Sequence, residues 1–221
     1  MDLLGTSDAA ALLEIDERAL RSLIADGRVE ARKIGGRWLV DGGSLARYRA
    51  VRRPAGGILS PRSAWSVLAL LEGREPPVEL NRSERARARE RADRIRSGAV
   101  IDLSRRATCS TWHVLPGLLD RLVADGRLRL TGARGRHRTD LVKAGPLDAY
   151  ITQSDLAGLV GAFGLRRGFG DSNVTLRVPL IAWPFGEGPV WAAATAFDLL
   201  EEPDDRARAA GHELLRRVIE P

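Results

Sequence analysis

Apolar positions along the first fifty residues follow spacings that predict two short helices joined by a tight turn. The first helix is expected over residues 7–13, where Asp8 places an acidic group in the first turn. Asp16 is suited to cap the second helix, which is expected to run to about residue 26. Apolar side chains of this second helix recur at i, i+3 and i+4 and face the first helix: Leu20, Leu23 and Ile24. The other side of the second helix is polar.

An alternating pattern follows these helices and predicts a pair of strands. Residues 29–34 and 37–40 alternate around Gly35-Gly36, a dipeptide suited to a two-residue hairpin turn. Trp38 lies in the second strand and is expected to pack beneath the hairpin rather than to stack on a base. Helix, tight turn, helix and hairpin in this order are the layout of a winged helix-turn-helix.

Four short segments in this region resemble the excisionase/MerR type of DNA-binding module. They are S-x-A-A-x-L-L, L-I-x-x-G-R, G-G-R-W and S-L-x-x-Y, at residues 7–13, 23–28, 35–38 and 44–48. The resemblance implies a winged helix-turn-helix over residues 1–53, with double-stranded DNA as its partner. It also implies that the helix from Asp16 enters the major groove, while the glycine turn of the wing touches the phosphate backbone.

Charged and polar side chains on the second helix and the hairpin are the candidates for DNA contacts. Arg18 and Arg21 are candidates for base edges or phosphates, and Glu17 can accept a hydrogen bond from a cytosine amino group. The helix contributes Glu17, Arg18, Arg21 and Ser22. The hairpin and the chain leading into it contribute Arg28, Arg32, Lys33, Gly35, Gly36 and Arg37.

The middle of the chain is expected to follow a linker at residues 54–61, which combines proline and glycine with few large side chains. A helix is expected over residues 62–71, and a second one from residue 82 to about residue 97 carries seven arginines. Some of these arginines share one side of the second helix and are candidates for phosphate contacts: Arg82, Arg85 and Arg89. The alternative is a solvated helix whose arginines pair with neighbouring acids. Both interpretations stay open.

A fifteen-residue stretch that begins at Leu23 recurs ninety-nine residues later, from Leu122, with seven identical positions. In both copies an apolar helix end leads through Ala-Asp-Gly-Arg into a basic, strand-like segment. The second copy predicts a winged-helix-like unit with a strand at 100–103, a helix at 113–123 and strands at 128–130 and 134–138. Arg134 and Arg136 would then contact DNA from a second wing. The alternative is a helix–strand joint used twice.

The last part of the chain has the pattern of an α+β domain. Residues 147–150, 155–163 and 173–178 alternate helix-like and strand-like patterns, and helices are expected over 192–200 and 204–219. The whole chain is therefore expected to be an α+β protein with four parts. These are the winged helix-turn-helix (1–53), the linker (54–61), a basic winged-helix-like middle domain (62–146) and an acidic α+β C-terminal domain (147–221).

Charge is distributed unevenly along the chain. The formal net charge of +6 divides into +2 for residues 1–53, +8 for 54–146 and −4 for 147–221. A basic front and an acidic rear suit a chain that offers one part to a polyanion and the other to a different partner. No apolar run is long enough to span a bilayer, and no secretory pattern is visible. A cytoplasmic, nucleoid-associated protein is expected, and the single cysteine, Cys109, fits a reducing compartment.

Residues with catalytic or metal-binding chemistry form no recognisable constellation in the sequence. Cys109 and His113 are four positions apart, but no further cysteine or nearby His/Asp pair completes a zinc set. Residues 168–173, GFGDSN, lack the surrounding pattern of a phosphate-binding loop. The acidic run at residues 201–205 is better explained as a helix cap than as a metal site. We therefore expect no cofactor, no metal and no enzymatic activity.

Two segments of the acidic rear resemble the AbiEi-like (abortive-infection, type IV) antitoxins and related regulators. They are the N-V-T-L-R-V strand at residues 173–178 and the run from Ala196 to Leu215. The resemblance implies a sequence-specific transcriptional regulator that represses its own operon, with a nucleotidyltransferase-like toxin as partner. Two alternatives stay open. One is an excisionase-like factor that bends DNA, and the other is a nucleic-acid-processing enzyme that uses Asp198, Glu201, Asp204 and Asp205. The oligomeric state is left undefined.

Overall fold

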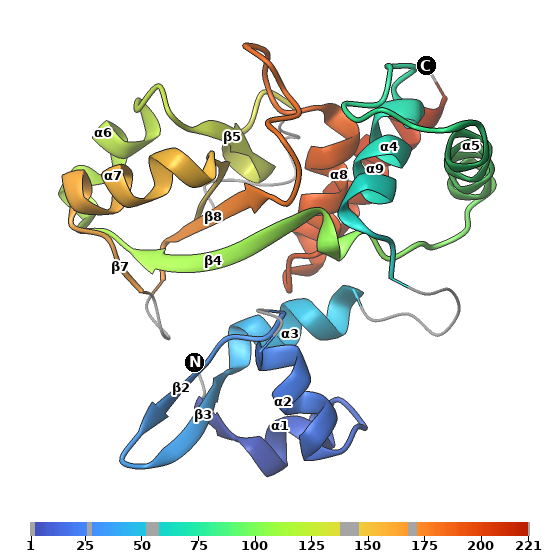
Figure 1. Cartoon of the computed structure of the whole chain (residues 1–221). Helices are drawn as coiled ribbons and strands as arrows, with labels where there is room; N and C mark the ends of the chain where they lie inside the picture. Colours follow the sequence, from blue (N-terminus) through green and yellow to red (C-terminus); the bar gives the residue numbers. More distant parts are fainter. Residues whose placement is uncertain (1–2, 26–27, 52–57, 138–145, 168–171, 221) are drawn as a thin grey trace.

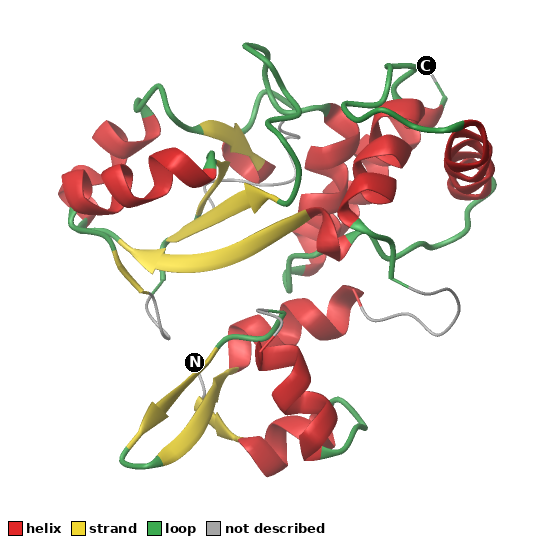
Figure 2. Ribbon diagram, in the orientation of Figure 1, coloured by secondary structure: helices red, strands yellow, loops and turns green. Residues whose placement is uncertain are grey.

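The computed structural model describes residues 3–25, 28–51, 58–137, 146–167 and 172–220. These residues form a small N-terminal domain and a larger body (Figures 1 and 2). Helices and strands contribute to both parts, as expected for an α+β protein. Figure 1 shows the N-terminal domain below the body, with helix α3 facing it.

The N-terminal domain contains the predicted pair of helices and the predicted hairpin. Its elements are β1 (Leu3–Gly5), α1 (Thr6–Leu12), α2 (Glu17–Ala25), β2 (Ala31–Ile34), β3 (Arg37–Asp41) and α3 (Gly42–Val51). The strands form an antiparallel sheet in the order β1-β3-β2. The short strand β1 is an addition that the sequence pattern did not indicate. Apolar side chains from α1, α2, β3 and α3 share one core: Ala9, Leu13, Leu20, Leu23, Val40 and Leu45.

The hairpin turns where predicted, at Gly35 and Gly36, with Ile34 paired to Arg37. The φ angles of the two glycines are +57° and +82°, values that L side chains rarely adopt. Positive φ at both central residues is what the favoured two-residue hairpin turn requires. The dipeptide therefore determines where the wing ends.

The body is built around a second sheet. Its elements are α4 (Pro61–Leu71), α5 (Arg82–Arg96), β4 (Ala107–His113), α6 (Leu119–Val123), β5 (Arg129–Thr131), β6 (Leu147–Tyr150), α7 (Gln153–Phe163), β7 (Arg166–Arg167), β8 (Val174–Pro179), α8 (Ala192–Leu200) and α9 (Asp205–Ile219), with short 3-10 segments at Ser104–Arg106, Pro116–Leu118 and Gly132–Arg134. The strand order is β5-β6-β8-β4-β7, and β6 is parallel to β8 while the other pairs are antiparallel. In Figure 1, α6 and α7 lie above the sheet, and α4, α8 and α9 gather beside one end of it.

The helices expected at 62–71, 82–97, 192–200 and 204–219 are confirmed to within one residue at each end. Local caps explain this accuracy for α4, α5 and α9. Ser60 accepts a hydrogen bond from the backbone N–H of Ser63 at the start of α4. Asn81 and Glu84 form a reciprocal capping box at the start of α5. Asp204 caps α9 by accepting from Ala207 N–H at 3.0 Å.

The expected boundary between residues 146 and 147 does not separate two units. Strands β4 and β5 lie before it, and β6, β7 and β8 lie after it, yet all of them belong to one sheet. Residues 58–137, 146–167 and 172–220 therefore share one fold, because each side of the expected boundary supplies strands that complete the other's hydrogen bonding.

The expectation of a second winged-helix-like unit is wrong. Residues 100–103 form no strand, and the expected helix at 113–123 is replaced by the end of β4, a 3-10 turn at Pro116 and the short α6. Strand β5 pairs with residues of β6 that lie 17 to 21 positions further on, instead of forming a hairpin with the segment that follows it directly. Residues 132–137 are a 3-10 turn and bends, and Arg138 lies outside the described residues. The repeated sequence is thus a helix–strand joint in two different folds.

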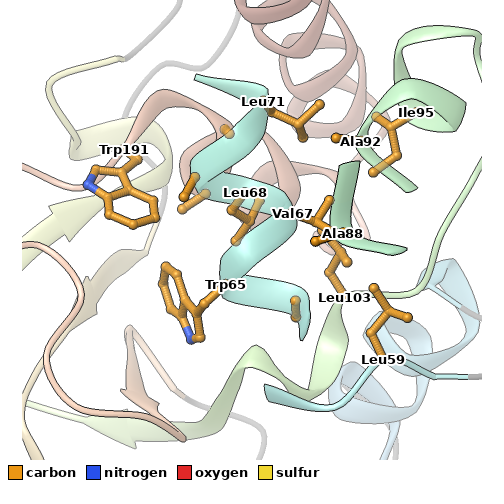
Figure 3. Close-up of a cluster of buried hydrophobic side chains, with 14 of the residues drawn as sticks. Leu59, Trp65, Val67, Leu68, Leu71, Ala88, Ala92, Ile95, Leu103 and Trp191 are labelled. Atoms are coloured by element: carbon orange, nitrogen blue, oxygen red, sulfur yellow. The ribbon is translucent and has the colours of Figure 1, made fainter. Parts of the chain in front are cut away.

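Helix α4 lies at the centre of the largest apolar core of the described residues. Figure 3 shows Trp65 and Trp191 on one side of it, with Ala88, Ala92 and Ile95 of α5 on the other. The Trp65 indole N–H donates to the carbonyl oxygen of Arg106 at 2.8 Å, which satisfies its polar atom inside the core. The helix is buried almost all round.

Candidate nucleic-acid interface

The polar side of α2 is set by the way this helix begins and packs. Asp16 Oδ1 accepts a hydrogen bond from Ala19 N–H at 2.7 Å, as the predicted cap should. Glu14, in the turn before it, has a positive φ of 54°. Because Leu20 and Leu23 point into the core, the opposite side of α2 faces solvent. The exposed side chains there include Arg18, Arg21 and Ser22.

Glu17 and Arg21 form an ion pair one turn apart along this exposed side. Arg21 Nη2 lies 3.0 Å from Glu17 Oε2, and the two side chains are 66% and 42% exposed. An exposed pair of this kind contributes little to stability. It does hold the Arg21 guanidinium close to the helix surface, where Arg18 lies three residues earlier. The sequence-predicted helix residues are therefore brought together on one face.

The hairpin presents a second set of exposed side chains. Lys33 and Arg37 are exposed on either side of the glycine turn. Trp38 pairs across the hairpin with Lys33 and is 45% exposed, so the expectation that it packs beneath the wing is wrong. The core-facing residues of the hairpin, Ala31 and Val40, lie nearer its base, and the part near the turn extends beyond the core. Local alternation could not show where the core ends.

Arg28 is not available to a phosphate in this structure, contrary to the expectation. Its side chain is 15% exposed, its Nη2 lies 3.5 Å from Asp102 Oδ2 of the body, and its guanidinium sits 4.8 Å from the ring centre of Tyr48.

Arg32 is exposed and lines a groove of about 740 Å³ between the hairpin and the body. Arg166 and Arg167, which the sequence analysis did not single out, line the same groove.

A second polar contact joins the N-terminal domain to the body. Glu30 accepts hydrogen bonds from the backbone N–H of Thr111 at 3.0 Å and from its hydroxyl at 2.8 Å. The partners of Glu30 and Arg28 lie 81 and 74 residues away in the chain, so no local pattern could identify this contact. Together the two contacts determine how the helix-turn-helix is held against β4.

The arginines expected on the rest of the chain are not brought together with α2 and the hairpin. Arg82 and Arg89 are exposed on α5, while Arg85 pairs with Glu75 at 2.9 Å. Figure 1 shows α5 at the opposite side of the body from the hairpin. Arg134 is half-buried and Arg136 is exposed at the turn after β5. These five arginines, unlike Arg166 and Arg167, therefore do not adjoin the helix-turn-helix.

The candidate catalytic carboxylates serve as ion-pair partners and caps. Buried Asp198 accepts from Arg106 Nη2 at 2.5 Å, from the Tyr150 hydroxyl at 2.9 Å and from the Thr131 hydroxyl at 2.6 Å. Burial raises the pKa of Asp198, but the cations of Arg177 and Arg106 outweigh it and hold the pKa below its ordinary value.

The neighbouring acids are engaged in the same way. Glu201 pairs with Arg106 and, at 2.8 Å, with Arg177. Asp204 caps α9, and Asp205 pairs with Arg208. Within the described residues, no group of three or more His, Cys, Asp or Glu side chains is arranged to hold a metal ion.

Comparison with known proteins identifies the N-terminal domain. Residues 3–52 match the family model described as "Helix-turn-helix domain". No curated protein and no solved structure matches the chain. No helix in the described ranges is long and apolar enough to cross a membrane. The chain thus carries a DNA-binding helix-turn-helix of the excisionase type, whose α2 and hairpin have the geometry given above.

Proposed function

We propose that this protein is a sequence-specific transcriptional regulator that reads its operator with α2 and the hairpin. The observation that carries the proposal is the match of residues 3–52 to a helix-turn-helix family, on a domain whose α2 presents Arg18, Arg21 and Ser22 to solvent. A helix of this width fits the major groove, and arginine pairs with guanine or phosphate there. Such a module acts by binding, and its location would be the nucleoid.

The hairpin is the second part of the proposed interface. Lys33 and Arg37 are exposed beside Gly35 and Gly36, whose lack of side chains lets the backbone approach a phosphate closely. Contacts of this kind fix register and orientation, while the helix supplies base readout. We leave Arg28 outside the interface, because it is held between Asp102 and Tyr48. The α5 arginines are also left outside it, because of their place in the body.

The proposed setting is an antitoxin that represses its own operon. The resemblance of residues 173–178 and 196–215 to AbiEi-like antitoxins supports it, and those segments form β8 and the α8–α9 pair in the structure. The partner would be a nucleotidyltransferase-like toxin. The proposal assigns no catalytic step, which fits the engagement of Asp198 and Glu201 with arginines.

The test compares two double variants with the same loss of charge. Arg18→Ala/Arg21→Ala removes exposed arginines from α2, and Arg82→Ala/Arg89→Ala removes exposed arginines from α5. Binding to the protein's own upstream DNA is measured by fluorescence anisotropy between low and moderate salt. Each good base contact contributes about 1–3 kcal/mol, so the α2 variant should bind at least about tenfold more weakly. The α5 variant should match the wild type, and an equal loss in both would contradict the assignment.

The antitoxin setting has a separate test. The protein is co-expressed with the product of the adjacent gene, and growth, promoter activity and co-purification are followed. Neutralisation of a toxic neighbour, together with repression of the shared promoter, is the expected result. A neighbouring integrase gene and strong DNA bending would instead indicate the architectural alternative.

A further inference from the structure

An apolar pocket lies in the body, away from α2 and the hairpin. It is enclosed by the end of α5, the segment 98–103, α8 and α9, and its volume is about 310 Å³. Small-molecule sites occupy roughly 300–1,000 Å³, so the pocket is of the size of a compact ligand. Apolar side chains form most of its wall: Ile95, Ile101, Leu103, Phe197, Leu215 and Ile219. Exposed polar side chains stand at the rim, among them His212, Arg216 and Glu220.

Two of the charged side chains of the lining, Glu201 and Arg216, are paired with residues outside it. Glu201 is bonded to Arg106 and Arg177, and Arg216 is paired with Glu213. The pocket therefore offers apolar contact to a ligand rather than a dominant charge, and it favours an uncharged, largely apolar molecule.

One wall of this pocket is also the segment that holds the N-terminal domain. Ile101 and Leu103 line the pocket, and Asp102 between them pairs with Arg28 of the helix-turn-helix. The carbonyl oxygen of Asp102 accepts from Leu59 N–H at 3.4 Å, and Leu59 and Leu103 belong to the same core (Figure 3). In Figure 1 the chain descends from α5 before it enters β4. A change at this wall thus acts directly on the contact between the two parts.

We propose that the pocket binds a compact, uncharged, largely apolar small molecule, and that occupancy weakens DNA binding through the segment 98–103. The coupling rests on the proposed function. A ligand that separates this segment from α9 displaces Asp102 from Arg28. The released helix-turn-helix then loses more orientational freedom when it binds DNA, which lowers its affinity. The ligand shifts the equilibrium between the state with the Asp102–Arg28 pair and the state without it, because it binds the second state more tightly.

Binding to the pocket is tested without DNA. Phenol, indole and naphthalene are titrated into the full-length protein, and two-dimensional NMR spectra of the backbone amides are recorded. Val100→Trp fills the pocket from a wall position that is 43% exposed, and Leu180→Trp makes a similar change at a position that is 49% exposed and outside the pocket. Saturable shifts at residues 98–103 and in α8 and α9 are expected in wild type and Leu180→Trp. Their absence, or their persistence in Val100→Trp, overturns the site.

Coupling is tested by repeating the DNA titration with the strongest of these probes at saturation. The dissociation constant for DNA should rise on the order of fivefold in wild type, within the usual range of allosteric couplings. Asp102→Asn keeps the oxygen that accepts from Ser104 N–H at 2.8 Å but loses the ionic pair with Arg28. This variant should bind the probe normally, and its own DNA affinity should not change when the probe is added. If the DNA affinity of the wild type does not change when the probe is bound, the coupling is overturned. Probe binding without any DNA binding would overturn the proposed function and leave the site intact.

Discussion

The arginines of α2 and the buried arginines of the body lie in opposite environments. On α2 the side chain of Arg21 is 66% exposed, and Arg18 is exposed beside it. In the body, the side chains of Arg106 and Arg177 are 1% and 3% exposed. An arginine-rich composition therefore does not by itself locate a nucleic-acid-binding surface. The groups that surround each guanidinium decide whether it binds a partner or stabilises the fold.

The buried arginines need several acceptors because a desolvated charge is costly unless it is paired and hydrogen-bonded. Arg177 donates to Asp148 from Nε and Nη2, both at 2.9 Å. Arg106 reaches Asp198 and Glu201 of the α8 region. Arg106 lies directly before β4, and Arg177 of β8 also lies 3.3 Å from Asp198 of α8, so this network connects the sheet to the helices beside it.

Asp198→Asn is expected to have the largest effect on stability, because it breaks the buried pairs and leaves cations uncompensated. The free energy of unfolding at pH 7 should fall by about 3–5 kcal/mol. The folded pKa of Asp198 lies below its ordinary value. The wild type therefore has this contribution in full above about pH 4 and loses it as the pH falls through the lowered pKa. Urea unfolding at neutral and acidic pH measures both effects.

The matched control is Asp205→Asn, in which the acid is 92% exposed and paired with Arg208. It should change the free energy of unfolding by less than about 1 kcal/mol. The difference in free energy of unfolding between Asp198→Asn and the wild type should become smaller at acidic pH. A difference that stays constant down to about pH 3 would mean that the charge of Asp198 is not what stabilises the body.

The double variant Lys33→Ala/Arg37→Ala removes the exposed charges of the hairpin and tests whether they bind phosphates. Each phosphate contact contributes about 0.9 to the slope of log affinity against log salt, so the slope should become less steep by about 2. Affinity should fall about tenfold at low salt and less at high salt, with little change in unfolding. A loss that is independent of salt would show that these side chains do not bind phosphates.

Sequence patterns predicted the N-terminal domain and the long helices because their signals are local. Capping residues, i+3 and i+4 apolar spacing and a Gly-Gly turn each act within a few residues. The same reasoning failed at residues 100–123. There the apolar spacing of Val114, Leu118 and Leu122 outweighed Pro116-Gly117 and the β-favouring run Thr108 to Trp112. That run becomes strand β4 only because β8 pairs with it from 62 to 70 residues further along the chain.

The exposure of the candidate interface residues was predictable to the same extent. Arg18, Arg21, Lys33 and Arg37 were placed correctly on exposed surfaces because α2 and the hairpin are local elements. Arg28 was not, since its environment comes from Asp102, which only the packing of the body supplies. The buried network was also missed as a network, because Arg106 and Asp198 are 92 residues apart. Long-range pairing of charges leaves no periodic signal in a sequence.

Glu30→Ala tests the joint between the two regions. It removes two charge-assisted hydrogen bonds to Thr111, which should release the helix-turn-helix from β4 at a cost of about 1–2 kcal/mol. The N-terminal domain should then unfold at a lower temperature than the body in calorimetry. The control is Glu90→Ala, an exposed acid of α5. Unfolding of both variants in one transition at the wild-type temperature would contradict a stabilising joint.

The smallest effect is expected for the exposed ion pair of the body, which is the intermediate case in the comparison. Arg85 and Glu75 lie 2.9 Å apart, as close as Arg177 and Asp148, but their side chains are 37% and 85% exposed. In water the attraction is screened and ordering two long side chains opposes it, so a double-mutant cycle with Arg85→Ala and Glu75→Ala should give less than about 0.5 kcal/mol. DNA affinity of Arg85→Ala should equal that of the wild type. A larger coupling would show that α5 is less solvated than its exposure indicates, and weaker DNA binding would move α5 into the interface.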